Sequence, residues 1–364
     1  MKFVYIPELD QKVSRVALGV NKTGNKHNSK HSEQKSRIRF YHDAMSLGVN
    51  LFDTAELYGG GHSEEILGNA ISGVRQDVLV CSKFNARNSE QTKLERSLES
   101  SLRRLKTDYI DFYLAHWPNP NVPIEDLICS LDKFKKQGKI RAYGLSNPVY
   151  KEVCDFKIKN NNNFFIVENE YNLIEREVET EILPFCKKNN FLFMAYSPLL
   201  QGKKVALSEK IIALEKKYAC TIQQIMLYWI GRKNVVSIVR TLNHDHLHDN
   251  IKSLDINMSE EDMKIVENFF GVKKSLIKIS EIKIDNRSYM SLNDAIGNKN
   301  DLIPSPALLA GRIKNKYSLP PLRVVKRGSK YEILDDYYFS EIKKYWASKI
   351  CNETEIEAYV FSDL

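Results

Sequence analysis

Residues 109–116 read Tyr-Ile-Asp-Phe-Tyr-Leu-Ala-His and form a nearly continuous apolar run. A short run rich in β-branched and aromatic side chains is typical of a strand buried on both faces, as in a parallel sheet. Amphipathic stretches of helical length lie on either side of it, at residues 93–105 and 124–137. This part of the sequence therefore predicts a βα unit of an α/β protein.

The same alternation repeats in both directions along the chain. The strand-length runs lie at residues 12–19, 51–55, 78–84, 109–116, 142–147, 164–171, 191–199 and 235–241. Eight βα units in about 250 residues are typical of a closed (β/α)₈ TIM barrel. An open doubly wound sheet is the alternative. It is weakened because no Gly-x-Gly-x-x-Gly follows any of the runs, as a Rossmann fold would require.

The pattern changes after about residue 270. Two strand-like runs follow at residues 322–325 and 331–334, and a helical stretch follows at residues 339–349. About 90 residues are enough for a small domain. We therefore expect a barrel over residues 1–272 and a small α+β domain over residues 273–364.

Composition excludes several classes of protein. The chain of 364 residues is 43% hydrophobic and 27% charged, close to the averages for globular proteins, which excludes disordered and fibrous chains. It has no apolar run of about 18 residues, and its first residues lack the apolar core of a signal peptide. The six cysteines form no Cys-x-x-Cys pair, as a zinc site or a disulfide framework would need. We expect a cytoplasmic protein that holds no metal and does not contact a membrane.

The net charge of +8 is modest, and residues 273–364 contribute 16 Lys and Arg against 12 Asp and Glu, an excess of +4. A positive segment can bind nucleic acid or phosphorylated ligands. An excess this small is more typical of a solvated surface. Nucleic acid is therefore not expected as a partner, and the sequence makes no prediction of oligomeric state.

Polar side chains end three neighbouring strands of the predicted barrel. Asp53, Lys83 and His116 end the second, third and fourth strands, and Tyr58 lies five residues after Asp53. Active sites of such barrels lie at the C-terminal ends of the strands, so these four side chains can converge on one pocket.

These residue types suit proton donation to an oxygen atom. A phenol, with a pKa of about 10, is a poor acid at neutral pH unless its anion is stabilised. The ammonium of Lys83 would lower the pKa of Tyr58, and Asp53 would keep that ammonium charged and oriented. His116 could orient a carbonyl group by a hydrogen bond. An Asp–Lys pair can be purely structural and a single His can be a core residue, but their joint occurrence favours catalysis.

Several motifs resemble the aldo-keto reductase superfamily. They include Gly-Val-Asn-Leu-Phe-Asp-Thr-Ala-Glu-Leu-Tyr-Gly at 48–59, Lys-Ile-Arg-Ala-Tyr-Gly-Leu-Ser-Asn at 139–147 and Ala-Tyr-Ser-Pro-Leu at 195–199. The resemblance covers roughly residues 1–270. It implies a (β/α)₈ barrel that binds NADP(H), or less often NAD(H), without a Rossmann fold. It also implies a catalytic tetrad of Asp53, Tyr58, Lys83 and His116.

The resemblance also implies a set of cofactor-binding residues. Ser146, Asn147 and Glu168 would hold the nicotinamide carboxamide, Tyr196 would stack on its ring, and Ser197, Leu199 and Gly202 would face the pyrophosphate. Arg240, Thr241, His246 and Asn250 would lie beside the adenosine 2′-phosphate.

Two of these positions, and Val239 beside Arg240, depart from the family pattern. Glu168 replaces the usual Gln, so either the alignment is displaced by a residue or two, or its negative charge favours the oxidised cofactor. Val239 replaces the usual Pro, and His246 stands where Arg or Gln is usual. Tyr196 could alternatively be a core residue. We expect NADPH rather than NADH because the guanidinium of Arg240 suits a phosphate.

The last part of the chain resembles the ParB/sulfiredoxin-like fold. Where that fold has a Gly-His-His-Arg type box, residues 335–340 read Asp-Asp-Tyr-Tyr-Phe-Ser. Adjacent carboxylates repel phosphate unless a divalent metal intervenes. We therefore interpret residues 273–364 as degenerate for nucleotide or DNA binding, and as a packing, oligomerisation or substrate-capping module.

The leading hypothesis is an NADPH-dependent reductase of a small aldehyde or ketone, a sugar or a biosynthetic metabolite, with Tyr58 as the general acid. An alternative is a cofactor-binding sensor or scaffold whose C-terminal domain mediates an interaction or binds nucleotide or DNA. A reductase fused to an active kinase or nucleotidase is a third possibility, which the missing box makes the weakest.

Overall fold

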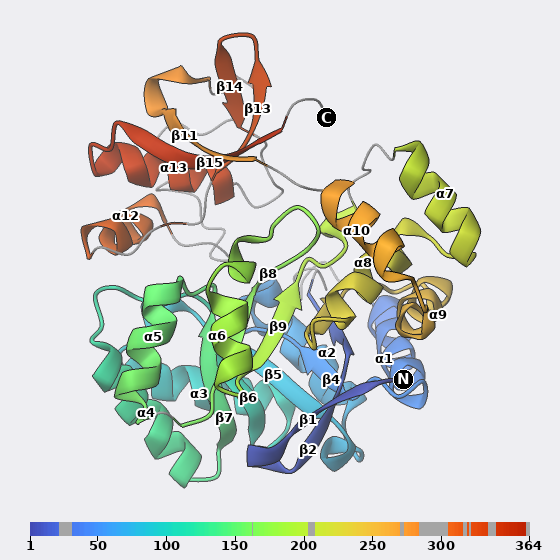
Figure 1. Ribbon diagram of the computed structural model, residues 1–364. Helices are drawn as coiled ribbons and strands as arrows, with labels where there is room; N and C mark the ends of the chain where they lie inside the picture. The colour runs from blue at the N-terminus through green and yellow to red at the C-terminus, as the bar shows by residue number, and fades with distance from the viewer. Residues whose placement is uncertain are drawn as a thin grey trace.

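A computed structural model describes residues 1–21, 31–161, 163–202, 208–269, 273–283, 305–315, 319, 322–333 and 340–361. Its main feature is a closed barrel of eight parallel strands, which confirms the predicted (β/α)₈ barrel (Figure 1). The strands, in chain order, are β3 (Val16–Gly19), β4 (Leu51–Asp53), β5 (Leu79–Phe84), β6 (Ile110–Ala115), β7 (Ile140–Ser146), β8 (Ile166–Glu170), β9 (Leu192–Tyr196) and β10 (Val236–Val239).

Helices cover the outside of the barrel (Figure 1). They are α1 (His31–Ser46), α2 (His62–Ala70), α3 (Gln91–Leu105), α4 (Ile124–Lys136), α5 (Tyr150–Lys159), α6 (Ile182–Lys188), α7 (Glu209–Tyr218), α8 (Ile222–Gly231), α9 (His244–Lys252) and α10 (Glu260–Phe269). In α3 the leucines at 94, 98, 102 and 105 are buried. Their spacing of three or four residues places them on one face, so hydrophobic burial against the strands orients the helix.

The predicted first strand, residues 12–19, is two strands in the structure. Residues Gln11–Ser14 form β2, which pairs with β1 (Phe3–Ile6) in an antiparallel hairpin, and only Val16–Gly19 enter the barrel. The break falls at Arg15, whose backbone N–H donates to the carbonyl of Lys2 at 2.9 Å. Ile6 and Val13 of the hairpin pack with barrel residues such as Leu51. The hairpin therefore closes the barrel at the end where the strands begin (Figure 1).

Residues beyond the barrel form a second sheet of five strands in the order β11-β15-β13-β14-β12. Its strands are β11 (Lys273–Lys278), β12 (Ile282–Lys283), β13 (Leu322–Arg327), β14 (Lys330–Ile333) and β15 (Glu355–Phe361), accompanied by α12 (Pro306–Lys314) and α13 (Ser340–Ile350). The sheet has its own apolar cluster, which includes Leu322, Val324, Tyr345 and Ala358. Residues 335–339 of the degenerate box lie outside the described residues.

Figure 1 shows this second sheet at the end of the barrel opposite the β1–β2 hairpin. The strands of the barrel point toward it, so it lies at the end where the strand termini carry the candidate site (Figure 1). Within the described ranges, no helix is both long and apolar enough to cross a membrane.

Candidate active site

Four polar side chains meet at the C-terminal ends of β4, β5 and β6. Asp53 ends β4, Lys83 lies in β5, and His116 directly follows β6. Tyr58 opens a short 3-10 turn, Tyr58–Gly61, after β4. The rings of Tyr58 and His116 meet edge to face with centroids 5.7 Å apart, and the Lys83 Nζ atom lies 5.6 Å from the centroid of the Tyr58 ring.

Lys83 is wholly buried at the centre of this group. Its ammonium donates to a carboxylate oxygen of Asp53 and to the carbonyl of Thr54 at 3.2 Å. Burial lowers the pKa of Lys83, but the nearby carboxylates of Asp53 and Glu168 outweigh burial and hold that pKa well above its ordinary value. The ammonium therefore stays charged at neutral pH and supplies a fixed positive charge beneath the Tyr58 ring.

His116 is neutral at physiological pH. Burial, and secondarily the Lys83 charge, lower the pKa of His116 to about 3. Its Nδ1 atom is buried and has no hydrogen-bond partner among the described residues. A neutral imidazole can orient a carbonyl by hydrogen bonding but does not release a proton of its own near neutral pH.

Glu168 lies in the middle of β8, paired in register with Ser146 of β7. Its Oε1 atom is 3.4 Å from the Lys83 Nζ atom and 3.5 Å from the Ser146 hydroxyl. Burial, and then the Asp53 charge, raise the pKa of Glu168 to about 8, although Lys83 opposes the shift. A carboxyl protonated below that pH can donate a hydrogen bond and carries no charge. The expectation of a negative charge at this position therefore holds only above about pH 8.

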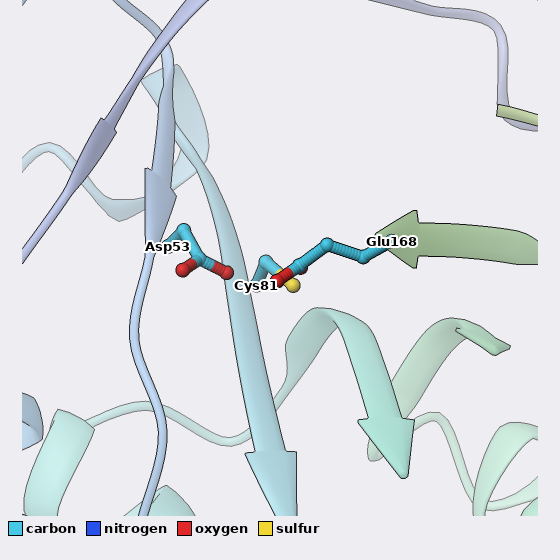
Figure 2. Close-up of side chains that lie close together, drawn as sticks. All are labelled: Asp53, Cys81 and Glu168. Carbon is cyan, nitrogen blue, oxygen red and sulfur yellow. The ribbon is translucent and has the colours of Figure 1, made fainter. Parts of the chain in front are cut away.

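Asp53, Cys81 and Glu168 have their polar atoms within 4.8 Å of one another, a spacing that could suit a metal (Figure 2). The Lys83 ammonium already contacts both carboxylates. Burial also raises the pKa of the Cys81 thiol well above its ordinary value, so the sulfur stays protonated. A cation held by thiolate and carboxylate would have to displace an ammonium, so this cluster does not fit a metal site.

Asn147 follows β7 and links two parts of the site. Its backbone is left-handed, with φ of 60°, a conformation that Asn tolerates better than most residues. Its side-chain amide donates to the His116 carbonyl at 3.0 Å, and the Tyr196 hydroxyl donates to its Oδ1 atom at 2.5 Å. Tyr196 ends β9, is only partly buried and lines the cavity, so it is not a core residue.

These groups face one cavity of about 830 Å³. All the sequence-predicted site residues except Lys83 line it: Asp53, Tyr58, His116, Ser146, Asn147, Glu168, Tyr196, Ser197, Leu199, Gly202, Arg240, Thr241, His246 and Asn250. Lys83 is wholly buried and acts on the cavity through Asp53 and Tyr58. One continuous space therefore runs from the catalytic candidates to the residues predicted to bind the adenosine end.

The predicted adenosine end combines a cation with a helix N-terminus. Arg240 is exposed, directly follows β10 and lies just before α9. Asn243 caps that helix by accepting a hydrogen bond from the His246 backbone N–H at 3.2 Å. A helix N-terminus next to a guanidinium favours a phosphate group.

Some cavity residues were not predicted from the sequence. They include Gly19, Trp117 and Asn169, charged residues such as Glu170, Glu175 and Glu181, and two residues of the C-terminal part of the chain, Leu319 and Lys344. Trp117 and Asn169 directly follow predicted site residues, so adjacency to a strand end could have identified them. No local pattern singles out Leu319 or Lys344.

The sequence model of the "Aldo/keto reductase family" matches residues 15–269. This chain belongs to that family. The prediction of an NAD(P)H-dependent oxidoreductase of aldo-keto reductase type is thereby confirmed for the barrel.

Relatives agree with this assignment. The chain is 30% identical over 249 residues to methylglyoxal reductase YeaE of Escherichia coli, covering 67% of this chain and 87% of that protein. It is 28% identical to an NADH-specific methylglyoxal reductase of the same organism, over 62% of this chain and 84% of that one. A Klebsiella pneumoniae aldo/keto reductase solved with NADP and acetate superposes with a TM-score of 0.68 at 27% identity, over 74% of this chain and 96% of the other.

Proposed function

We propose that this aldo/keto reductase reduces an aldehyde or ketone with NADPH. The observation that carries the proposal is the buried Asp53–Lys83 ion pair beneath Tyr58, with Tyr58 and His116 both facing the cavity. It is an arrangement that delivers a proton to an oxygen atom in a site large enough for a dinucleotide and a small substrate.

Each of the four candidate catalytic residues would have a separate role in the reduction. Bound NADPH would supply hydride to the carbonyl carbon. Tyr58 would donate its hydroxyl proton to the carbonyl oxygen, and the Lys83 ammonium would stabilise the resulting phenolate. Asp53 holds Lys83 in place, and neutral His116 would orient the carbonyl by a hydrogen bond.

The cavity fits the predicted cofactor. Ser146, Asn147 and protonated Glu168 offer donors and acceptors for a carboxamide, and Tyr196 offers a ring for stacking. Arg240 and the N-terminus of α9 suit the 2′-phosphate that distinguishes NADPH from NADH. The NADP-bound Klebsiella structure supports this choice.

Two relatives are named as methylglyoxal reductases, so small 2-oxoaldehydes belong in the first substrate panel, beside aldehydes of sugars and biosynthetic metabolites. The remaining assignments rest on the sequence alone. They are a cytoplasmic location, a domain boundary near residue 273 and a ParB/sulfiredoxin-like C-terminal fold.

Replacing Tyr58 by Phe tests the mechanism. We expect Tyr58→Phe to lower kcat for aldehyde reduction by about 10²–10⁴-fold, because the proton donor is lost. NADPH binding, followed by fluorescence titration, should change less than threefold because the ring remains.

Tyr5 provides a matched control because it is exposed and lies in the hairpin at the opposite end of the barrel. Tyr5→Phe should keep the wild-type kcat. Retained turnover in Tyr58→Phe, or an equal loss of turnover and NADPH binding, would remove Tyr58 as the acid. Wild-type binding of NADPH without turnover of any carbonyl would instead support the sensor hypothesis.

A further inference from the structure

The second sheet, α12 and α13 form a unit that we call the cap, made of the described residues from 273 to 361. A buried apolar cluster joins it to the barrel: Leu309, Ala310 and Ala347 come from the cap, and Ala86 and Trp117 come from the barrel. Trp117 lines the cavity and directly follows His116. The cap therefore packs directly against the active-site wall.

A buried arginine carries this contact to the nicotinamide side of the cavity. Arg312 of α12 is wholly buried. Its Nη2 atom pairs with the Glu152 carboxylate of α5 and also donates to the Asn147 carbonyl at 3.2 Å. One guanidinium of the cap thus joins a barrel helix to the backbone of a candidate cofactor-binding residue.

Side chains hold the backbone of the loop between β7 and α5. Arg312 donates to the carbonyl of Asn147, and the Asn169 side chain donates to the carbonyl of Pro148 at 3.0 Å. The Val149 N–H donates at 2.9 Å to the carboxylate that Arg312 pairs with. A buried backbone group without a partner costs free energy, so each of these side chains favours the observed path of the loop.

The conformation of Asn147 matters because its side chain bridges two cavity-lining residues. The left-handed backbone, with φ of 60°, sets the direction of that side chain. The amide donates to the His116 carbonyl and accepts from the Tyr196 hydroxyl. A turn of this peptide would break both contacts and release Tyr196, the residue that offers its ring to the nicotinamide.

We propose that Arg312 is a positioning residue for NADPH binding. From the cap, it holds the Asn147 backbone so that the Asn147 side chain keeps Tyr196 and the bound nicotinamide aligned. The proposal rests on the proposed NADPH-dependent reduction and adds that the barrel depends on the cap to bind this cofactor tightly.

Loss of the guanidinium tests the proposal in the full-length protein. We expect Arg312→Met to raise the NADPH dissociation constant about tenfold, as for loss of a charged hydrogen bond. Fluorescence titration well below each variant's melting temperature measures this constant. Because Arg312→Met also leaves Glu152 as a buried charge without its partner, the variant is expected to lower the melting temperature as well.

A double variant separates positioning from stability. Arg312→Met with Glu152→Gln removes both charges, and the Gln oxygen can still accept from the Val149 N–H. We expect the melting temperature to return toward the wild-type value while the NADPH dissociation constant stays about tenfold raised. Glu152→Gln alone keeps the guanidinium and should change that constant by no more than about threefold.

A mutant cycle tests whether Arg312 acts through Asn147. Asn147→Gly removes the bridging amide, and glycine adopts a left-handed backbone without penalty. In the Asn147→Gly background, Arg312→Met should weaken NADPH binding by no more than about twofold further, because the group that it positions is absent.

Val324 supplies a matched control because it lies in the apolar cluster of the cap's own sheet. Val324→Ala should lower the melting temperature by leaving a cavity. It should change the NADPH dissociation constant by no more than about twofold, since the loop after β7 is untouched.

Each contrary result has its own meaning. If the double variant regains wild-type NADPH affinity together with its melting temperature, Arg312 only stabilises the fold and the proposal is overturned. It is also overturned if Glu152→Gln alone weakens binding as much as the double variant, or if Arg312→Met has its full effect in the Asn147→Gly background. If the wild type does not bind NADPH, the proposed function itself fails, and this inference fails with it.

Discussion

At the scale of single residues, Glu168 shows how position changes chemistry. A glutamate in place of the usual glutamine would ordinarily bring a negative charge to the nicotinamide side of the site. Here burial and the Asp53 carboxylate raise its pKa to about 8, so it is a neutral hydrogen-bonding group through most of the physiological range. Protonated Glu168 can thus donate as an amide does.

This residue makes stability depend on pH. Glu168 retains its proton to about pH 8 in the folded protein but loses it near its ordinary pKa of 4.5 when unfolded. The folded state thus binds more protons between about pH 4.5 and pH 8, so this group's contribution to stability falls as pH rises through that window. Relative to wild type, Glu168→Gln should show a shallower loss of unfolding free energy from pH 5 to pH 8.

Urea denaturation of the cofactor-free protein at several pH values measures the difference. Glu177→Gln is a suitable control because Glu177 begins a short 3-10 helix and its side chain is partly exposed, whereas Glu168 is buried against Lys83. If the unfolding free energies of wild type and Glu168→Gln changed with pH in the same way, that result would contradict the elevated pKa of Glu168.

At the scale of secondary-structure elements, the register in which β7 pairs with β8 places Ser146 opposite Glu168. Gly144 lies opposite Ile166 in this register. A Cβ atom on residue 144 would lie only 1.9 Å from the Ile166 carbonyl oxygen, so the two strands approach in a way that only glycine permits. The glycine therefore serves the site by allowing the strands that carry two cofactor-binding candidates to pair closely.

Gly144→Ala should destabilise the protein by about 2 kcal/mol or more, because the added methyl group forces the backbones apart. Thermal or chemical unfolding measures the loss. Gly231→Ala is the comparison, since its Cβ atom would meet Leu254 at an ordinary 3.5 Å, and it should change stability by about 1 kcal/mol or less. Equal effects of the two substitutions would argue against the close approach of β7 and β8.

At the scale of the whole molecule, the Arg312–Glu152 ion pair joins the cap to the barrel. Both side chains are buried, and burial raises the pKa of Glu152 even though Arg312 opposes that shift. Breaking one partner of a buried pair leaves the other uncompensated, whereas replacing both removes the penalty.

Arg312→Met should therefore lower the unfolding free energy by about 3–5 kcal/mol, and adding Glu152→Met should recover part of the loss. A double-mutant cycle by chemical denaturation measures the coupling. The exposed Lys93–Glu90 pair is the control: Lys93→Met should lower the unfolding free energy by about 1 kcal/mol or less. Additive effects of the Arg312 and Glu152 substitutions would show that the two residues do not act as a pair.

Local pattern was enough to predict the barrel and the candidate tetrad. Apolar runs such as residues 109–116 and 78–84 correspond to β6 and β5, because burial on both faces leaves a continuous apolar signature. Asp53, Lys83 and His116 could be predicted as site residues because they lie at the ends of predicted strands, and a closed barrel brings those ends together. The split at Arg15 was missed because residues 12–19 read as one run of strand length, and only the tertiary fold turns the chain there.

The sequence by itself determined the (β/α)₈ architecture and the identity of the residues at its mouth, because both follow from short-range periodicity and motif. Only the tertiary structure decided the protonation of Glu168, because it depends on side chains from β4 and β5. Only the tertiary structure also brought Arg312 into contact with Asn147, which lies 165 residues earlier in the chain. Burial and contacts between distant segments set these properties, and neither leaves a pattern in neighbouring residues.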